Sequence, residues 1–143
     1  MIGLVQTYIG GGKGKTTAAV GQSIRAVGAG KRVYFAQFLK DDTGNELKIL
    51  KTLSGITVAK APHRLPFYFQ MTDQQKRDYN LTANTMLDEA INAAYLNRAD
   101  MVVLDEVLDA VDLEIIDIKK LVEFIKNKPR GMELVLTGHN AIK

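Results

Sequence analysis

The chain contains no cysteine, and it has no long run of apolar residues. Without cysteine the protein cannot form disulfides, build a thiolate metal site or use a cysteine nucleophile. No stretch approaches the ~18 consecutive apolar residues that a membrane-spanning helix needs. The first residues form a usable strand, not the basic and apolar regions of a signal peptide. We therefore expect a cytoplasmic protein without membrane attachment.

Charge of either sign is also modest, since 19 Lys and Arg against 16 Asp and Glu give a net charge of +3. The basic residues are scattered along the chain, so we expect no nucleic-acid partner. An apolar fraction of 46% in 143 residues is typical of one globular domain with a single buried core. The chain shows no internal repeat, linker or low-complexity segment, and we expect one domain over residues 1–143.

What the chain does have is a glycine-rich loop at residues 10–17, Gly-Gly-Gly-Lys-Gly-Lys-Thr-Thr. It follows an apolar run and precedes an alanine-rich stretch with helical periodicity. Glycines let several backbone N–H groups point at one polyphosphate, and a helix N-terminus adds partial positive charge. Lys15 would reach the terminal phosphates, and Thr16 would place its hydroxyl on Mg²⁺. A flexible surface turn has no need of Lys-Thr at a helix start, so we interpret residues 10–17 as a phosphate-binding loop.

Strands and helices are predicted to alternate along the chain. Expected strands cover residues 4–9, 32–39, 56–61, 101–104 and 133–137, and expected helices cover 17–29, 45–53, 72–97 and 117–126. The third helix begins with capping-box spacing between Thr72 and Gln75, and side chains expected to face the core include Ile24, Tyr95 and Ile118. Strands separated by helices pair in parallel. We predict an α/β fold of the three-layer P-loop NTPase type, with a mainly parallel sheet of about five strands and ligands beyond the strands' carboxyl ends.

The apolar strand at 101–104 supplies a second sign of a nucleotide site, because it ends in Asp105-Glu106. An acidic residue at the tip of a buried strand can hold Mg²⁺ opposite Thr16, although either residue alone could simply cap the next turn. Together with the glycine loop, the metal role is the better interpretation. Thr16, Asp105 and Glu106 are the candidate metal ligands, and the choice between the two carboxylates stays open.

Several short motifs resemble, in the same order, those of the bacterial ATP:corrinoid adenosyltransferases. They are the loop itself, Arg-Ala-Val-Gly at 25–28, Gln-Phe-Leu-Lys at 37–40, Gly-Asn-Glu at 44–46, Leu-Asp-Glu at 104–106 and Leu-Thr-Gly at 136–138. The resemblance implies a homodimeric transferase of cobalamin biosynthesis in which the Co(I) of a corrinoid attacks C5′ of the ATP ribose and expels triphosphate. Implied with it are Mg²⁺ or Mn²⁺, and a flavin-dependent cobalt reductase as partner.

The resemblance also implies roles for individual residues. Lys13, Lys15 and Glu106 would act in catalysis, with the lysines neutralising charge on the leaving triphosphate. Nucleotide or corrinoid contacts would come from Gly10, Gly11, Gly12, Lys13, Gly14, Lys15, Thr16, Thr17, Arg25, Phe67, Phe69 and His139. His139 stands where the family usually has arginine, and it can also donate to phosphate. Family members usually continue for a few tens of residues beyond the last strand, so we expect this chain to lack their C-terminal tail.

Three successive aromatic residues, Phe67-Tyr68-Phe69, lie in a proline-flanked loop. From the residues alone they would be a core plug between the third strand and the long helix. The resembled family carries Phe-Thr-Trp in the corresponding loop, where the aromatics fill the lower face of the corrin and displace its axial ligand. Phe67 and Phe69 stand at the matching positions, so both interpretations remain open.

Two other function classes also remain open. One is a P-loop ATPase switch, although the absence of lysine at position 10 counts against it. The other is a non-catalytic module that binds nucleotide or corrinoid. A small-molecule kinase is disfavoured, because no lid with several arginines follows the long helix. The reaction product distinguishes the classes: adenosyl transfer releases triphosphate, a switch releases ADP and phosphate, and a binding module turns nothing over.

Overall fold

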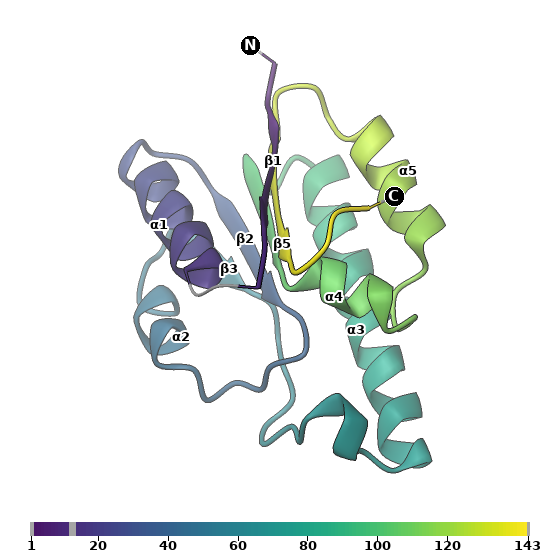
Figure 1. The fold of residues 1–143 in the computed structure, drawn as a ribbon. Coiled ribbons are helices and arrows are strands. Elements are labelled where there is room, and N and C mark those ends of the chain that lie inside the picture. The colour runs from purple at the N-terminus through teal and green to yellow at the C-terminus, as the bar shows by residue number, and fades with distance from the viewer. Residues whose placement is uncertain (1, 12–13, 143) are drawn as a thin grey trace.

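A computed structural model of the chain describes residues 2–11 and 14–142, and at its centre lies a sheet of five strands (Figure 1). The strands lie in the order β1-β5-β4-β2-β3, and each neighbouring pair is parallel. Their bounds are Val5–Ile9 for β1, Val33–Gln37 for β2, Ile56–Val58 for β3, Met101–Asp105 for β4 and Glu133–Gly138 for β5. Every residue of β2 and β4 is buried, which suits central strands covered on both faces.

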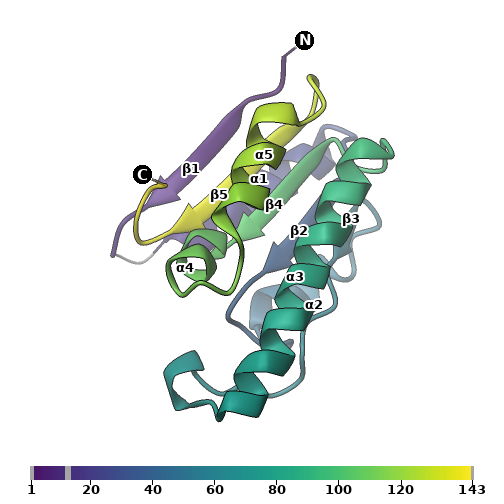
Figure 2. The same ribbon diagram turned by 90° about the vertical axis from the view of Figure 1, so that its right-hand side faces the viewer.

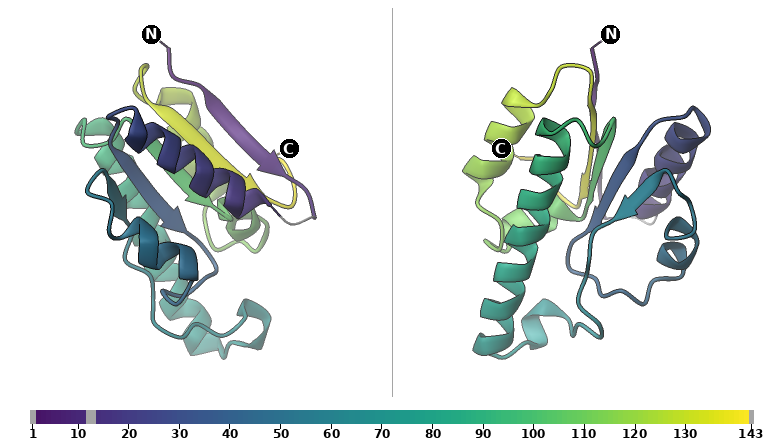
Figure 3. Two further views of the ribbon diagram at one scale, coloured as in Figure 1. Left: turned by 90° about the vertical axis from the view of Figure 1, so that its left-hand side faces the viewer. Right: turned by 180° about the vertical axis from the view of Figure 1, so that it is seen from behind.

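Helices cover both faces of the sheet (Figures 2 and 3). On one face lie α1 (Lys15–Gly28) and α2 (Asn45–Leu50); on the other lie α3 (Asp73–Tyr95), α4 (Val107–Asp112) and α5 (Ile118–Asn127). Each face has its own cluster of buried apolar side chains. The predicted three-layer α/β fold with a parallel sheet is confirmed. In the described part of the chain, no helix has the length and apolar character needed to span a membrane.

Local sequence signals account for much of this arrangement. At the start of α3, the backbone N–H of Gln75 donates to Thr72 Oγ1 at 3.1 Å, and the backbone N–H of Thr72 donates to Gln75 Oε1 at 2.9 Å. The predicted capping box is therefore confirmed. Three side chains expected to face the core are instead exposed: Ile24 at 47%, Tyr95 at 49% and Ile118 at 40%.

One helix, α4, was not predicted from the sequence. It has six residues and begins directly after the acidic end of β4. Such a short segment shows too few turns for helical periodicity to be recognised. It packs Leu108 so closely against β5 that a Cβ added to Gly138 would lie 2.4 Å from Leu108 Cβ. The glycine at the end of β5 thus lets α4 approach the sheet.

The register of the sheet gathers the sequence motifs at one edge. Ile9 of β1 pairs with Gly138 of β5, and Gln37 of β2 pairs with Asp105 of β4. The glycine loop, the acidic end of β4 and the end of β5 therefore meet where the strands finish, which is where α/β folds bind ligands.

Candidate functional site

The glycine loop joins the end of β1 to the start of α1. Gly10 and Gly14 have φ angles of 139° and 108°, which side chains rarely tolerate. Gly14 caps α1, and among the described residues no side chain caps this helix end, and the start of a helix is a favourable place for an anion. Lys15 Nζ donates to the backbone oxygen of Gly10. Gly12 and Lys13 lie outside the described residues.

The hydroxyl of Thr16 meets the acidic end of β4, as the sequence predicts. Its Oγ1 donates to Asp105 Oδ2 at 2.9 Å, across 89 positions of sequence. Asp105 has no exposed surface, and side chains of neighbouring strands also donate to it, Thr137 at 2.7 Å and Gln37 at 3.4 Å. The carboxylate is thus held in one orientation between β2, β5 and α1.

Lys40, just beyond β2, adds a positive charge to this group. Its Nζ donates to Thr16 Oγ1 at 3.0 Å and to Asp105 Oδ2 at 3.3 Å, and it lies 3.8 Å from Glu106 Oε1. The ammonium therefore lies between the hydroxyl and the two carboxylates that the sequence assigns to a metal. A cation is accommodated at this position.

Glu106 takes the left-handed conformation, with φ of 60°, at the junction of β4 and α4. Its backbone N–H donates to Thr137 Oγ1 at 2.7 Å. Burial raises the pKa of the Glu106 carboxyl above its ordinary value, Lys40 acts against this shift, and the nearby carboxylates of Asp105 and Asp109 add to it.

The side chain of Gln37 is polar, only 3% exposed and incompletely paired. Its Nε2 donates to Glu46 Oε1 at 2.9 Å and to Asp105 Oδ2 at 3.4 Å. Within residues 2–11 and 14–142, its Oε1 has no hydrogen-bond partner. A buried acceptor without a donor at such a site suits a bound ligand or its water shell.

The oxygen donors fit Mg²⁺, which prefers hydroxyl, carboxylate and phosphate ligands. Thr16 and Asp105 supply the first two, with Glu106 beside them. No cluster of three or more His, Asp or Glu side chains that could hold a metal alone is present in the described residues. A Mg²⁺ ion here would depend on phosphate oxygens and water for its remaining ligands, as is usual for this ion.

The two phenylalanine side chains of the aromatic loop do not fill the core, as a core plug would. Phe67 and Phe69 are 71% and 77% exposed, and their rings stack on each other at 5.8 Å between centroids. Only Tyr68 between them packs against the core, within the 3-10 turn Tyr68–Gln70. The core-plug interpretation is therefore wrong for the two phenylalanines. Phe67 also lines a pocket of about 290 Å³ that Gln37 and Lys40 share.

Other predicted site residues lie at varying distances from this centre. Gly11 and Thr17, both within the loop motif at residues 10–17, are exposed. Arg25 lies in the last turn of α1 and is exposed; it stands ten positions after Lys15, which is about 15 Å along the helix axis. His139 follows β5, and its Nδ1 lies 2.8 Å from Asp109 Oδ1. The structure therefore groups Thr16, Asp105 and Glu106 but does not bring Arg25 to them.

The sequence motifs include Lys40, Gln37 and Thr137, but the sequence alone predicts no role for these three side chains. The signal that could have found them is their place at or just beyond the carboxyl ends of β2 and β5. Each contributes a polar atom to Asp105.

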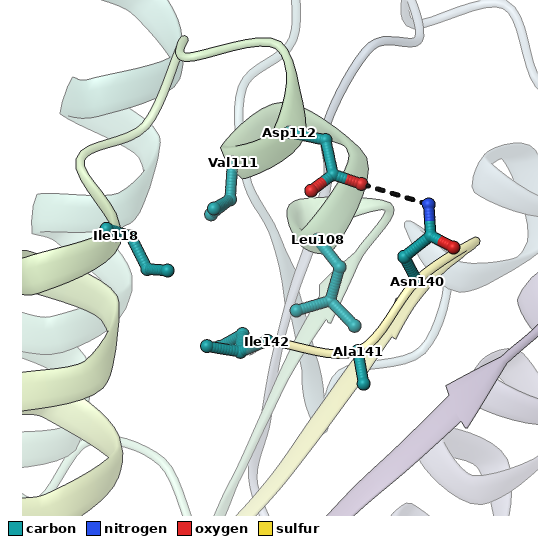
Figure 4. A pocket seen from close by; sticks show the side chains of 7 residues that line it. All are labelled: Leu108, Val111, Asp112, Ile118, Asn140, Ala141 and Ile142. Carbon is teal, nitrogen blue, oxygen red and sulfur yellow. Dashed lines mark hydrogen bonds between the residues drawn. The ribbon is translucent and has the colours of Figure 1, made fainter.

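A second hollow lies on the α4 and α5 side of the same sheet edge (Figure 4). It has a volume of about 440 Å³. Its lining comes from Leu108, Val111, Asp112, Ile118, Asn140, Ala141 and Ile142. Asn140 Nδ2 donates to Asp112 Oδ2 at 3.3 Å at its rim, while the remaining lining is mostly aliphatic (Figure 4). None of the candidate site residues lines this hollow.

Comparison with known proteins supports one family. Residues 1–143 match the family described as ATP:corrinoid adenosyltransferase BtuR/CobO/CobP. The chain is 31% identical over 142 residues to the corrinoid adenosyltransferase of Escherichia coli, covering 95% of this chain and 67% of that protein. It is 30% identical to corrinoid adenosyltransferase CobA of Salmonella typhimurium, with the same coverage. For the corrinoid adenosyltransferase of a Sinorhizobium species, identity is 31%, covering 97% of this chain and 65% of that protein.

Proposed function

The chain belongs to the ATP:corrinoid adenosyltransferase family, and we propose that it transfers the 5′-deoxyadenosyl group of ATP to the cobalt of a corrinoid. The observation that carries this proposal is the meeting of Thr16, from the glycine loop, with the buried Asp105 at 2.9 Å. This contact joins a phosphate-binding loop to an acidic strand end, the two parts that a metal-bound nucleotide needs.

The reaction we propose has a simple balance. The Co(I) of the reduced corrinoid donates an electron pair to C5′ of the ATP ribose, so that a Co–C bond forms. The C5′–O bond breaks, and the triphosphate leaves with the electron pair of that bond. Because Co(I) is a strong nucleophile, the protein has mainly to position the two substrates in line and to stabilise charge on the leaving group.

The loop residues would stabilise that leaving group. Lys15 would turn from the Gly10 carbonyl, where it donates in the structure, toward the phosphates. We assign the same role to Lys13 and to the loop N–H groups, including those of Gly11 and Gly12. Mg²⁺, or Mn²⁺ in its place, would supply further positive charge when held by Thr16 and Asp105, with Glu106 alongside.

Phe67 and Phe69 would bind the corrinoid. Their exposure of 71% and 77% leaves two stacked aromatic rings for a large planar partner. Phe67 lines one pocket together with Gln37 and Lys40, both of which contact Asp105, and this supports binding of both substrates on one side of the sheet edge. His139 beside the loop and Arg25 on α1 are proposed as further nucleotide contacts. A homodimer and a flavin-dependent cobalt reductase as electron source complete the proposal.

An anaerobic assay tests this function directly. The protein is incubated with ATP, Mg²⁺ and chemically reduced cob(I)alamin, while the corrinoid spectrum is followed and the phosphate product is analysed. We expect adenosylcobalamin and intact triphosphate in equal amounts. ADP and phosphate would instead identify an ATPase switch, and ATP binding without turnover would identify a binding module; either result overturns the proposal.

Two variants make the assay specific to the site. Thr16→Val removes the hydroxyl that contacts Asp105 and should abolish turnover. Thr52→Val is the matched control, because Thr52 is exposed just after α2 and its hydroxyl donates only to the backbone oxygen of Ile49. Equal loss of activity in both variants would contradict the site assignment.

A further inference from the structure

The position of Lys40 leads to an inference about how a metal ion enters the site. Its ammonium lies 3.0 Å from Thr16 Oγ1, 3.3 Å from Asp105 Oδ2 and 3.8 Å from Glu106 Oε1. These three groups are the ligands that we assign to the divalent cation. The lysine therefore lies close to where that cation would bind.

We propose that Lys40 is a displaceable counter-ion: it occupies the divalent-cation position until a metal–polyphosphate complex arrives, and it thereby makes metal binding depend on nucleotide. This inference rests on the proposed function only in that the site binds a metal–nucleotide complex. It concerns the order of binding and not the transfer step.

Charge balance gives the physical reason. The carboxylate of Asp105 has no exposed surface, whereas the side chain of Lys40 is 32% exposed. A buried carboxylate requires a compensating positive charge, and an ammonium on a flexible stem can supply it without being fixed in place. A divalent ion alone would have to displace the ammonium and leave it without its carboxylate partners. A bound triphosphate removes this penalty, because its oxygens can pair with the displaced ammonium.

The surroundings of Lys40 are consistent with such a movement. Lys40 lines the pocket of about 290 Å³ together with Thr43, Gly44 and Phe67, so its side chain borders open space into which it can move. Gln37 provides a second, independent sign of a ligand at this place. Its Oε1 is buried beside Asp105 and has no donor among the described residues, and a metal-bound water could supply one.

The test measures metal binding without nucleotide and without turnover. Mn²⁺ binding to the full chain is titrated by the loss of the free-ion electron paramagnetic resonance signal, first alone and then with saturating ATP. We expect the wild-type protein to bind Mn²⁺ weakly alone and tightly with ATP. Lys40→Met should bind Mn²⁺ alone roughly 5–150-fold more tightly, the range usual for coupled sites, and should gain correspondingly less from ATP.

Two further variants control for charge and folding. Lys40→Arg keeps the positive charge and should keep the weak nucleotide-free binding. Lys48→Met removes an equal charge from the exposed face of α2 and should leave Mn²⁺ binding unchanged. As a second measurement, Mn²⁺ alone should raise the melting temperature of Lys40→Met more than that of wild type, which also shows that the variant is folded.

The inference is overturned if Lys40→Met binds Mn²⁺ alone no more tightly than wild type, or if Lys48→Met shows the same increase. Failure of the proposed function gives a different result. In that case the Mn²⁺ titrations would follow the expected pattern, while reduced cobalamin and ATP would give no adenosylcobalamin.

Discussion

Replacing Thr137 by valine should destabilise the protein and disorder its acidic site, because one hydroxyl holds two groups there. Thr137 has no exposed surface. Its Oγ1 donates to Asp105 Oδ1 at 2.7 Å and accepts the backbone N–H of Glu106 at 2.7 Å. Valine has nearly the same shape, so the substitution removes both hydrogen bonds without opening a cavity.

The magnitude follows from the two losses. A buried N–H left unpaired costs about 1–3 kcal/mol, and a hydrogen bond to a charged group contributes about 1.5–3 kcal/mol. Because Asp105 keeps its contacts with Thr16 and Gln37, we expect a total near the lower end, about 3 kcal/mol. Thr137→Ser is the matched control, since it keeps the hydroxyl and loses one methyl group, worth about 0.8 kcal/mol.

Urea unfolding of the three proteins measures these differences. With an unchanged slope m, the midpoint should fall more for Thr137→Val than for Thr137→Ser. Affinity for Mn²⁺-ATP should fall in the valine variant and be retained in the serine variant. Only the valine substitution removes the hydrogen bonds of residue 137 to the Asp105 carboxylate and to the backbone N–H of Glu106. A valine variant as stable as the serine variant would refute this reasoning.

Three further predictions concern other parts of the molecule. Phe67→Ala with Phe69→Ala should abolish adenosylation that starts from Co(II) corrinoid but spare ATP binding and stability, since both rings are exposed; loss of ATP binding would contradict this. Asp100→Asn should destabilise the protein near pH 7 by less than about 1 kcal/mol, because the exposed Arg32 lowers the pKa of Asp100 by hydrogen bonding. The difference in urea midpoint should begin to shrink near the ordinary pKa of 3.8 and disappear once the pH falls through the lower pKa of the folded state, and a constant difference would contradict it. Gly138→Ala should lower the unfolding free energy by about 1–3 kcal/mol by overpacking against α4, whereas Gly21→Ala, with open space around it on α1, should raise the melting temperature slightly.

Much of the fold could be predicted because its signals are local. The apolar residues of β4, the capping box at Thr72 and the glycine loop each act within a few positions of sequence. The orientation of Ile24 and Tyr95 could not be predicted in this way. Both lie on helices with an apolar side, but the width of the contact with the sheet decides which apolar residues remain exposed.

The candidate site was only partly predictable, for a related reason. Thr16 and Asp105 could be paired because both belong to the carboxyl edge of a parallel sheet. The contact of Lys40 with both of them depends on the reach of a long side chain, which sequence spacing does not determine. The aromatic loop is similar, since the 3-10 turn directs Tyr68 inward and leaves its two neighbours exposed.

The backbone of the acidic site is held in place at two strained turns. Leu39 and Glu106 both have positive φ, at 62° and 60°, just beyond the carboxyl ends of β2 and β4. Such conformations cost about 1–3 kcal/mol each and persist only where the surroundings enforce them. In both cases a hydroxyl accepts the backbone N–H: Tyr79 holds Leu39 at 2.6 Å, and Thr137 holds Glu106 at 2.7 Å.

Tyr79 and Thr137 are 3% and 0% exposed, so the packed core fixes the backbone that carries Lys40 and the two carboxylates. The ammonium groups, in contrast, are on flexible stems, and Lys15 and Lys40 both contact oxygens of the protein itself. A polyphosphate that binds here can therefore exchange these contacts for its own without moving the strands. The buried hydroxyls of Tyr79 and Thr137 keep this backbone in position during that exchange. A change at Thr137 should therefore weaken binding of Mn²⁺-ATP, whereas loss of the Lys40 charge should mainly strengthen Mn²⁺ binding in the absence of nucleotide.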